Sequence, residues 1–260
     1  MKKIIAMLMA VMMTIGMLAA CAPAEIEEAG QNTYNLQTVK EGYLTIVTSP
    51  DYAPYEFYAL DKDGNPSLAG FDMDLAKYIA DYLGLTLDVI PMSFDGIVGE
   101  MAAGVADLAI AGLSPDPERA EKMDFSQIYY GGKQAFITCK NNKDKFTDLA
   151  STNDASLSIG AQTGTIQMEL AQENSANAQI VSLAKATDII AEVASGTLDG
   201  AYVEWDVAIA YQANYPDLHI VCEVPYDVEG NAVGVKKGNT ALLEGVNKAI
   251  ADCVDKGEFS

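Results

Sequence analysis

The sequence predicts an α/β protein of two lobes, each with a mostly parallel sheet flanked by helices and joined by two hinge crossings. Strand-like and helix-like segments alternate along the chain, and this alternation occurs twice. In both halves a helix is followed by the pattern Gly-x-x-Asp and then by an apolar strand, at residues 104–107 and 196–199. A length of 260 residues is sufficient for two such lobes.

The first half begins with a β-branched, alternating segment at residues 43–48, which predicts a strand. Turn-forming residues follow at 49–54. Residues 71–82 then place apolar side chains at helical spacing, and Gly84 ends that helix. The elements expected next are a strand at 85–92, a helix at 95–103 closed by Gly104, and a buried strand at 107–111.

The second half repeats this order of elements. Its expected elements are a strand at 156–161, a helix at 165–173, a strand at 178–183, a helix at 186–194 and a strand at 200–203. We therefore predict that residues 43–128 and 231–260 form lobe 1, that 134–227 form lobe 2, and that 129–133 and 228–230 form the hinge. Gly131 and Gly132 would supply backbone freedom at the first crossing.

Composition argues against several classes of function. The chain has 16 Lys and Arg against 37 Asp and Glu, and its formal net charge of −21 disfavours nucleic acids and anionic lipid surfaces as partners. One histidine and four cysteines leave little material for a metal site or a histidine-based catalytic triad. No G-x-G-x-x-G or P-loop follows a predicted strand, so neither a nucleotide nor another cofactor is expected.

The N-terminus has the pattern of a secretory signal. Lys2 and Lys3 precede an apolar run at residues 4–20, which is short for a membrane span of about 20 residues, although an uncleaved anchor is the alternative. The segment Leu-Ala-Ala-Cys at 18–21 resembles a bacterial lipobox, which implies that residues 1–20 are removed and that Cys21 is lipidated, for example with palmitate. Residues 21–42 would then form a flexible tether.

Candidate binding residues come from the segments that follow the predicted strands, where open α/β sheets bind ligands. A guanidinium suits a carboxylate, a helix N-terminus also favours an anion, and a separate carboxylate suits an ammonium group. This set of groups is complementary to a free amino acid. Each of these residues could also have a purely structural role: Arg119 and Glu204 could be surface charges, and Tyr52 and Phe94 could belong to the hydrophobic core.

Six ordered motifs in the chain resemble those of family 3 extracellular solute-binding proteins, the amino-acid receptors of ABC importers. They include Thr-Ser-Pro-Asp-Tyr-Ala-Pro-Tyr-Glu-Phe at 48–57 and Gln-Thr-Gly-Thr at 162–165. The others lie at residues 69–76, 94–97, 107–119 and 124–126. The resemblance covers about residues 42 to 260 and implies the type II periplasmic-binding-protein fold.

The resemblance also implies roles for individual residues. Arg119 would clamp the ligand α-carboxylate, assisted by Ser114 and the Thr165 amide. The Gly112 carbonyl, the Ser114 hydroxyl and Glu204 would hold the α-ammonium group. The remaining candidates are Tyr52 and Phe94, which would sandwich the ligand side chain, and Gln162, which would line the wall of the smaller lobe.

Two departures from the family pattern affect the expected ligand. Glu204 stands where relatives more often have aspartate, so the pocket would be shifted or tightened. Ser49 stands where many receptors for basic amino acids have an acid, which weakens a lysine or arginine assignment, although Asp51, Glu56 and Asp95 are nearby in sequence. Stacking and cation–π attraction from the aromatic pair favour a polar or basic L-amino acid.

The resemblance implies a monomeric receptor that is lipid-anchored through Cys21 on the outer face of the cell membrane and delivers its ligand to a membrane permease. One alternative is a cyclohexadienyl-dehydratase-like enzyme, in which a glutamate of the cleft or His219 would do acid–base work. His219 lies in an expected strand at 217–221, away from the cleft. The other alternative is a sensor domain, whose chain would normally continue into a signalling segment.

Overall fold

The computed structural model describes residues 36–227 and 230–257. The expected signal peptide at 1–20, Cys21, most of the tether, and residues 228–229 of the second crossing lie outside the described residues. Within the described part of the chain, no helix combines the length and the apolar character needed to cross a membrane.

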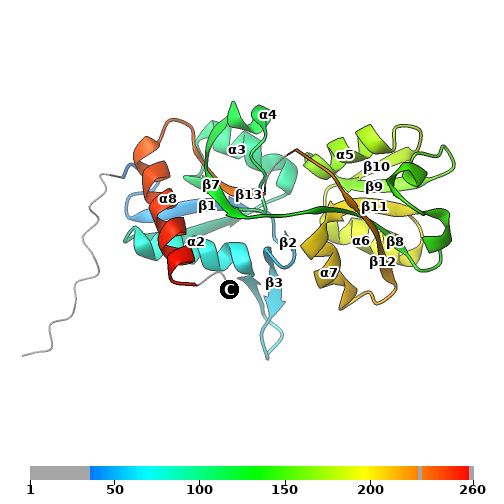
Figure 1. Cartoon of the computed structure of the whole chain (residues 1–260). Helices are drawn as coiled ribbons and strands as arrows, with labels where there is room; N and C mark the ends of the chain where they lie inside the picture. Colours follow the sequence, from blue (N-terminus) through cyan, green and yellow to red (C-terminus); the bar gives the residue numbers. More distant parts are fainter. Residues whose placement is uncertain (1–35, 228–229, 258–260) are drawn as a thin grey trace, which may run out of the picture. The chain divides into compact units, whose positions relative to one another are not determined.

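Two five-stranded sheets organise the described chain (Figure 1), and the three adjacent parallel strands of each sheet follow one order, with the first of the three in the middle. The first sheet has the order β5 (Thr86–Pro91), β1 (Tyr43–Thr48), β6 (Leu108–Ala109), β13 (Asn231–Lys236) and β7 (Met123–Tyr130). The second sheet has the order β10 (Gln179–Leu183), β9 (Ser158–Gln162), β11 (Gly200–Glu204), β8 (Gln134–Cys139) and β12 (Leu218–Val224). The expected α/β fold with two sheets is therefore confirmed.

Both sheets are mixed rather than mostly parallel. In the first sheet β1 is parallel to β5 and β6, whereas β13 is antiparallel to β6 and β7. In the second sheet β9 is parallel to β10 and β11, whereas β8 is antiparallel to β11 and β12. The reason is connectivity: β8 follows β7 after three residues, so it enters where the parallel strand β11 ends, and Gln134 pairs with Glu204.

Helices pack on the sheets and bury apolar side chains against them. The helices that accompany the first sheet are α2 (Phe71–Tyr82), α3 (Ile97–Ala103) after the short η1 (Phe94–Gly96), α4 (Pro117–Ala120) and α8 (Thr240–Asp255). The helices of the second sheet are α5 (Ile166–Asn174), α6 (Ala186–Ser195) and α7 (Trp205–Gln212). Helices α2 and α8 lie side by side and share one apolar core with β1 and β6. Two short 3₁₀ turns, η2 (Lys143–Lys145) and η3 (Leu149–Thr152), complete the helical elements.

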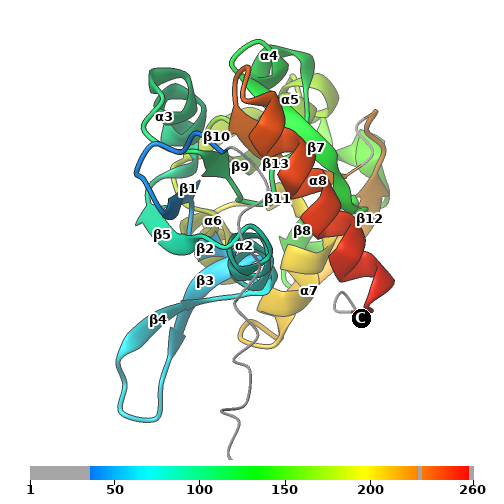
Figure 2. The same cartoon turned by 90° about the vertical axis from the view of Figure 1, so that its left-hand side faces the viewer.

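A small antiparallel sheet interrupts the first half between β1 and α2. It consists of β2 (Asp51–Tyr52), β3 (Glu56–Leu60) and β4 (Pro66–Ala69). The β3–β4 hairpin extends away from the first sheet in Figure 2. Because β2 begins three residues after β1 ends, this sheet brings Asp51, Tyr52 and Glu56 to the carboxyl edge of the parallel strands.

The repeated Gly-x-x-Asp pattern has the same structural role in both halves. Gly104 and Gly196 end their helices in the left-handed conformation, with φ of 73° and 80°. The Asp107 carboxylate accepts hydrogen bonds from the amides of Thr45 and Val39 at 2.9 and 2.8 Å. The Asp199 carboxylate accepts one from the Ser158 amide at 2.9 Å and pairs with Lys145. Each aspartate thus fastens its strand to the parallel neighbour.

The first crossing between the sheets is short. β7 ends at Tyr130 and β8 begins at Gln134. Neither Gly131 nor Gly132 has a positive φ, but a Cβ atom on Gly132 would overlap the Glu204 carboxylate. The close approach of the Glu204 side chain to the backbone therefore explains why residue 132 is glycine. The hinge at this crossing stays a prediction.

Candidate functional site

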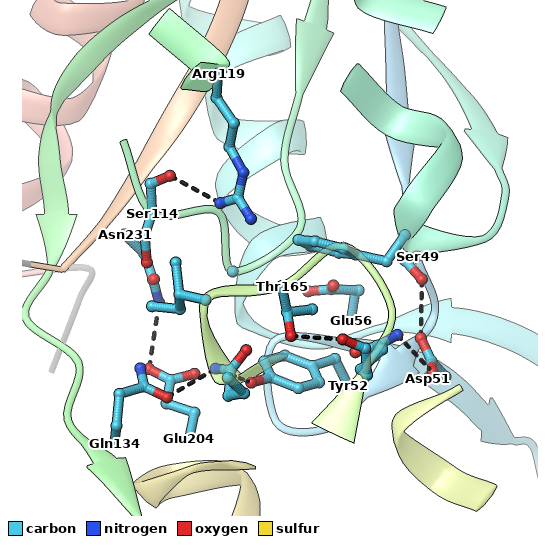
Figure 3. A pocket seen from close by; sticks show the side chains of 15 residues that line it. Ser49, Asp51, Tyr52, Glu56, Ser114, Arg119, Gln134, Thr165, Glu204 and Asn231 are labelled. Carbon is cyan, nitrogen blue, oxygen red and sulfur yellow. Dashed lines mark hydrogen bonds between the residues drawn. The ribbon is translucent and has the colours of Figure 1, made fainter. Parts of the chain in front are cut away.

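All eight residues expected to bind a ligand line one cavity (Figure 3). They are Tyr52, Phe94, Gly112, Ser114, Arg119, Gln162, Thr165 and Glu204. The other lining residues are Ser49, Asp51, Glu56, Gln134, Ile166, Gln167 and Asn231. Of the three acids considered as substitutes for an acid at position 49, Asp51 and Glu56 line this cavity and Asp95 does not. The cavity lies at the carboxyl ends of parallel strands, as the fold class predicts.

Arg119 is held rigidly in a buried position. Its Nε atom pairs with the Asp116 carboxylate at 2.9 Å, and its two Nη atoms donate to the carbonyls of Ser114 and Gly164 at 2.9 and 3.1 Å. The guanidinium carbon lies 5.4 Å from the centre of the Phe94 ring. Burial lowers the pKa of Arg119, yet a guanidinium stays charged at neutral pH. Two of its five N–H donors are left for a carboxylate.

The N-terminus of α5 lies beside this guanidinium. Thr165 is the N-cap residue, and its hydroxyl accepts a hydrogen bond from the Met168 amide at 3.3 Å. The same hydroxyl donates to the Gln162 carbonyl at 2.8 Å, which fixes the turn between β9 and the helix. A helix N-terminus carries a partial positive charge. Arg119 and α5 therefore make one part of the cavity suitable for an anion.

Glu204 supplies an acidic group at the end of β11. Its side chain is buried, and Oε1 accepts hydrogen bonds from the Tyr55 hydroxyl at 2.7 Å and from Asn231 Nδ2 at 3.4 Å. Burial raises the pKa of Glu204 to about 8, despite these two donors. At neutral pH the carboxyl is therefore mostly protonated unless a cation lies next to it.

Two further acids line the cavity. The Asp51 carboxylate accepts hydrogen bonds from Ser49 Oγ at 2.8 Å, Gln162 Nε2 at 3.3 Å and the Ala186 amide at the start of α6 at 2.6 Å. The Glu56 side chain has no exposed surface. Burial raises the pKa of both carboxyls, and for Glu56 the shift is large. The cavity thus has three carboxyl groups and one guanidinium among its lining residues.

A chain of polar side chains forms another wall. Gln167 Nε2 donates to Gln134 Oε1 at 2.7 Å and to the Tyr52 hydroxyl at 3.2 Å. The Tyr52 ring stacks on Tyr55 with 5.9 Å between ring centres. Gly112, at a φ of 53°, leaves room for the Tyr52 ring, because a Cβ atom there would lie 3.3 Å from it.

The sequence did not indicate Gln134 and Asn231 as part of the site. Both lie at the start of a strand, whereas ligand residues were expected after strand ends. The antiparallel entry of β8 and β13 places these starts beside the ends of the parallel strands. His219, in contrast, is exposed on β12 and does not line the cavity, as expected.

Comparison with known proteins agrees with the fold. The sequence profile of bacterial extracellular solute-binding proteins, family 3, matches residues 44–260. The arginine-binding extracellular protein ArtP of Bacillus subtilis (strain 168) is 28% identical over 248 residues, which cover 94% of this chain and 92% of ArtP.

Two solved structures extend this likeness. An amino acid ABC transporter substrate-binding protein from Streptococcus pneumoniae Canada MDR_19A, bound to L-arginine, is 37% identical, with a TM-score of 0.78, over 83% of this chain and 90% of that one. The ancestral amino acid-binding protein AncCDT-1, a precursor of cyclohexadienyl dehydratase, is 31% identical with a TM-score of 0.74, over 83% and 91% of the two chains. The chain belongs to family 3 of the bacterial extracellular solute-binding proteins.

Proposed function

We propose that this protein captures a basic L-amino acid outside the cell and delivers it to the membrane permease of an ABC importer. The main support for this proposal is the set of charged residues that line the cavity, which are three acids and one arginine. A zwitterionic amino acid needs one cationic and one anionic partner, which Arg119 and Glu204 can supply. Asp51, which is partly buried, and Glu56, which is fully buried, are then additional acids, and a charge in such a place is stable only when it is paired. A second positive charge on the ligand would pair with this extra negative charge.

The proposed pose follows from the positions of the charged groups. The α-carboxylate would meet Arg119, Ser114 and the N-terminus of α5 at Thr165. The α-ammonium group would meet Glu204 and the Gly112 carbonyl. The side-chain cation would reach Glu56, which lies in the wall with Asp51.

The uncharged lining residues would complete the site. The rings of Tyr52 and Phe94 would pack along the alkyl part of the ligand, and Gln162 would close the wall beside Asp51. Many receptors for basic amino acids bind the side-chain cation of the ligand with an acid at the position of Ser49. In this protein Glu56 would bind that cation instead.

A thermal-shift screen against the twenty common L-amino acids, followed by calorimetry on the hits, tests the function. We expect arginine and lysine to raise the melting temperature most. A ligand present at about a hundred times its dissociation constant adds roughly 2.7 kcal/mol to the free energy of unfolding. Tighter binding of a sugar, a peptide or an amine-free acid than of every amino acid would contradict the proposal.

We also propose that the protein binds its ligand without turning it over. The similarity to AncCDT-1 makes a dehydratase the alternative to test. In support, the one histidine of the chain is exposed and does not line the cavity, although the protonated form of Glu204 could act as an acid. Incubation with a cyclohexadienyl carboxylic acid should yield no aromatic product, and measurable turnover would establish the enzyme instead.

We propose that Cys21 carries a lipid anchor, on the basis of the segment at residues 18–21. A Cys21→Ala variant expressed in a bacterial host should lose fatty-acid labelling and leave the membrane fraction or stay unprocessed. Cys222→Ala is the matched control, since Cys222 is a free thiol within the second sheet. Full labelling of the Cys21→Ala variant would show that the lipid is elsewhere.

A further inference from the structure

Two buried acids, Glu56 and Asp72, are forced together by the start of α2. The amides of Phe71 and Asp72 donate to the carbonyls of Pro54 and Tyr55 at 3.0 and 2.8 Å, so the helix begins directly against the segment before β3. Gly70 permits this approach, because its φ is 119° and a Cβ atom would overlap the Tyr55 carbonyl. The first turn of α2 therefore lies next to the first residue of β3.

The two carboxyl groups have very different partners. Asp72 Oδ2 accepts a hydrogen bond from the Gly112 amide at 2.7 Å, and the Tyr129 hydroxyl lies 2.8 and 3.0 Å from the two Asp72 oxygens. Among the described residues, no N–H or O–H group donates to either carboxylate oxygen of Glu56. The Glu56 carboxyl instead faces the Asp72 carboxyl. Neither side chain has any exposed surface.

Two ionised carboxylates offer only acceptors to each other. A hydrogen bond between Glu56 and Asp72 therefore requires one proton, which either group can carry. Without that proton, two like charges would face each other in a site closed to solvent, which is strongly unfavourable.

Among the described residues, the groups that act most strongly on the pair include no cation. The charges that act on Glu56 come from Asp72, from Asp51 on β2 and from Glu204 on β11, and all of them are acidic. The main partners of Asp72 are Glu56 and the two donors Gly112 and Tyr129. Arg119 lines the same cavity but pairs with Asp116. Burial and the neighbouring acids raise the pKa of Glu56 far above its usual value, and burial raises the pKa of Asp72 to about 6.

We propose that Glu56 and Asp72 share one proton in the ligand-free protein, and that the side-chain cation of a bound amino acid takes the place of this proton. The proposal rests on the proposed function, since it concerns the same cavity. The proton leaves the Glu56–Asp72 hydrogen bond for the solvent, and the ligand brings one positive charge, so the charge of the pair and its partner does not change. A neutral side chain in the same place would release no proton from the pair.

This exchange predicts a pH dependence with a definite sign. The ligand-free pair holds its proton more tightly than the ligand-bound pair, so binding releases a proton and is favoured by higher pH. The dissociation constant for L-arginine should fall by up to about tenfold per pH unit while the free pair keeps its proton. Glu204 adds its own contribution in the same direction, because its pKa of about 8 would also fall beside an ammonium group.

Calorimetry in buffers of different ionisation enthalpy separates these contributions. L-arginine is titrated at pH 7 in phosphate and in Tris, and the difference in enthalpy gives the number of protons released. Glu56→Gln should bind more weakly and release nearly one proton fewer, because its amide can donate to Asp72, which already accepts from Gly112 and Tyr129 and therefore stays ionised. Glu204→Gln is the matched control and should retain the proton released by the pair. L-citrulline, a neutral isostere of arginine, should leave that proton in place.

The outcomes are distinguishable from failure of the proposed function. Equal proton release by wild type and Glu56→Gln would overturn the shared proton while arginine binding still stood. If neither arginine nor lysine bound, the proposed function would fail, and infrared spectroscopy of the ligand-free protein would show whether the pair carries a proton. A carbonyl band of a protonated carboxyl that is lost in Glu56→Gln, shifted in Asp72→Asn and kept in Glu204→Gln would support the shared proton. A band unchanged by the two substitutions would contradict it.

Discussion

The parallel strands of the two sheets share one order, and both sheets use the Gly-x-x-Asp contact, yet the sheets contribute different chemistry to the cavity. In the first sheet β1 leads into the small β2–β3–β4 sheet, which supplies the carboxyl groups of Asp51 and Glu56, and β6 is followed by the short helix α4, which carries Arg119. Parallel strands of the second sheet lead into α5, α6 and α7, so that sheet contributes helix N-termini together with Glu204.

The comparison shows where recognition can vary without a change of fold. Hydrogen bonds between strands and apolar packing against helices hold each sheet together, and they do so in the same way in both sheets. The segments after the strands make no such hydrogen bonds, so their residues can change without a change of fold. A cavity between two similar frameworks can thus combine localised charges from one with backbone dipoles from the other.

The largest effect should follow removal of the cation of the first sheet. Arg119→Ala should weaken L-arginine binding by roughly 30-fold to several thousandfold, since it leaves a buried carboxylate without its partner. Arg119→Lys should also bind poorly, because an ammonium group lacks the planar fork. Calorimetry measures both, with the exposed Lys122→Ala as control. If the alanine variant kept wild-type affinity, Arg119 would not bind the ligand carboxylate, and the N-terminus of α5 would be its binding site.

The next effect concerns the one acid that the second sheet contributes. Wild-type protein should bind the deaminated analogue of its ligand at least about a hundredfold more weakly than the amino acid, a gap of roughly 2.7 kcal/mol. In Glu204→Gln this gap should become much smaller, because the ammonium group loses its charged partner. Competition calorimetry of both ligands on both proteins gives the comparison. An equal gap in the two proteins would assign the ammonium group to another acid.

The fastening aspartates allow a direct test of how alike the two halves are. Asp107→Asn should lower the free energy of unfolding by about 1–3 kcal/mol, since the buried carboxylate accepts from two backbone amides. Asp199→Asn should cost less, about 0.5–1.5 kcal/mol, because one of its partners is the half-exposed Lys145. Urea denaturation measures both, with exposed Asp63→Asn as the control. The reverse order would mean that the second half depends more on its fastening.

The smallest effect should come from the contact between Asp51 of the first half and α6 of the second. Asp51→Asn keeps the shape but removes the charge at the Ala186 amide, and it disturbs the bond from Gln162. We expect affinity for arginine to fall about three- to tenfold, near 1 kcal/mol. Asp63→Asn again serves as the control. An unchanged affinity would show that this contact does not support the bound state.

Local patterns predicted the elements whose signals are contained in a few neighbouring residues. The strand at Tyr43–Thr48, the helix at Phe71–Tyr82 and a helix that starts next to Thr165 were all predicted correctly. The eight candidate residues came from the segments after strands and from the family resemblance, and they line one cavity because strand ends converge at one edge of a sheet.

The remaining features depend on contacts between distant segments. Asp72 has the pattern of a surface acid in the first turn of a helix, and only the approach of Gly70 to Tyr55 buries it. Gln134 and Asn231 belong to strands whose antiparallel direction follows from how the chain passes between the sheets. The partner of Arg119, Asp116, is near in sequence, but nothing in the spacing shows that the pair is buried.

The missing side chain at Gly132 has a consequence for anyone who redesigns the ligand preference of this receptor. The Glu204 carboxylate occupies the space that a Cβ atom of residue 132 would need, although the two positions are far apart in sequence and Gly132 does not line the cavity. A library restricted to the lining residues would therefore omit a position that decides where the carboxylate can stand. In engineering terms, Gly132 lies behind the wall of the cavity, and its missing side chain leaves the space that the Glu204 carboxylate occupies.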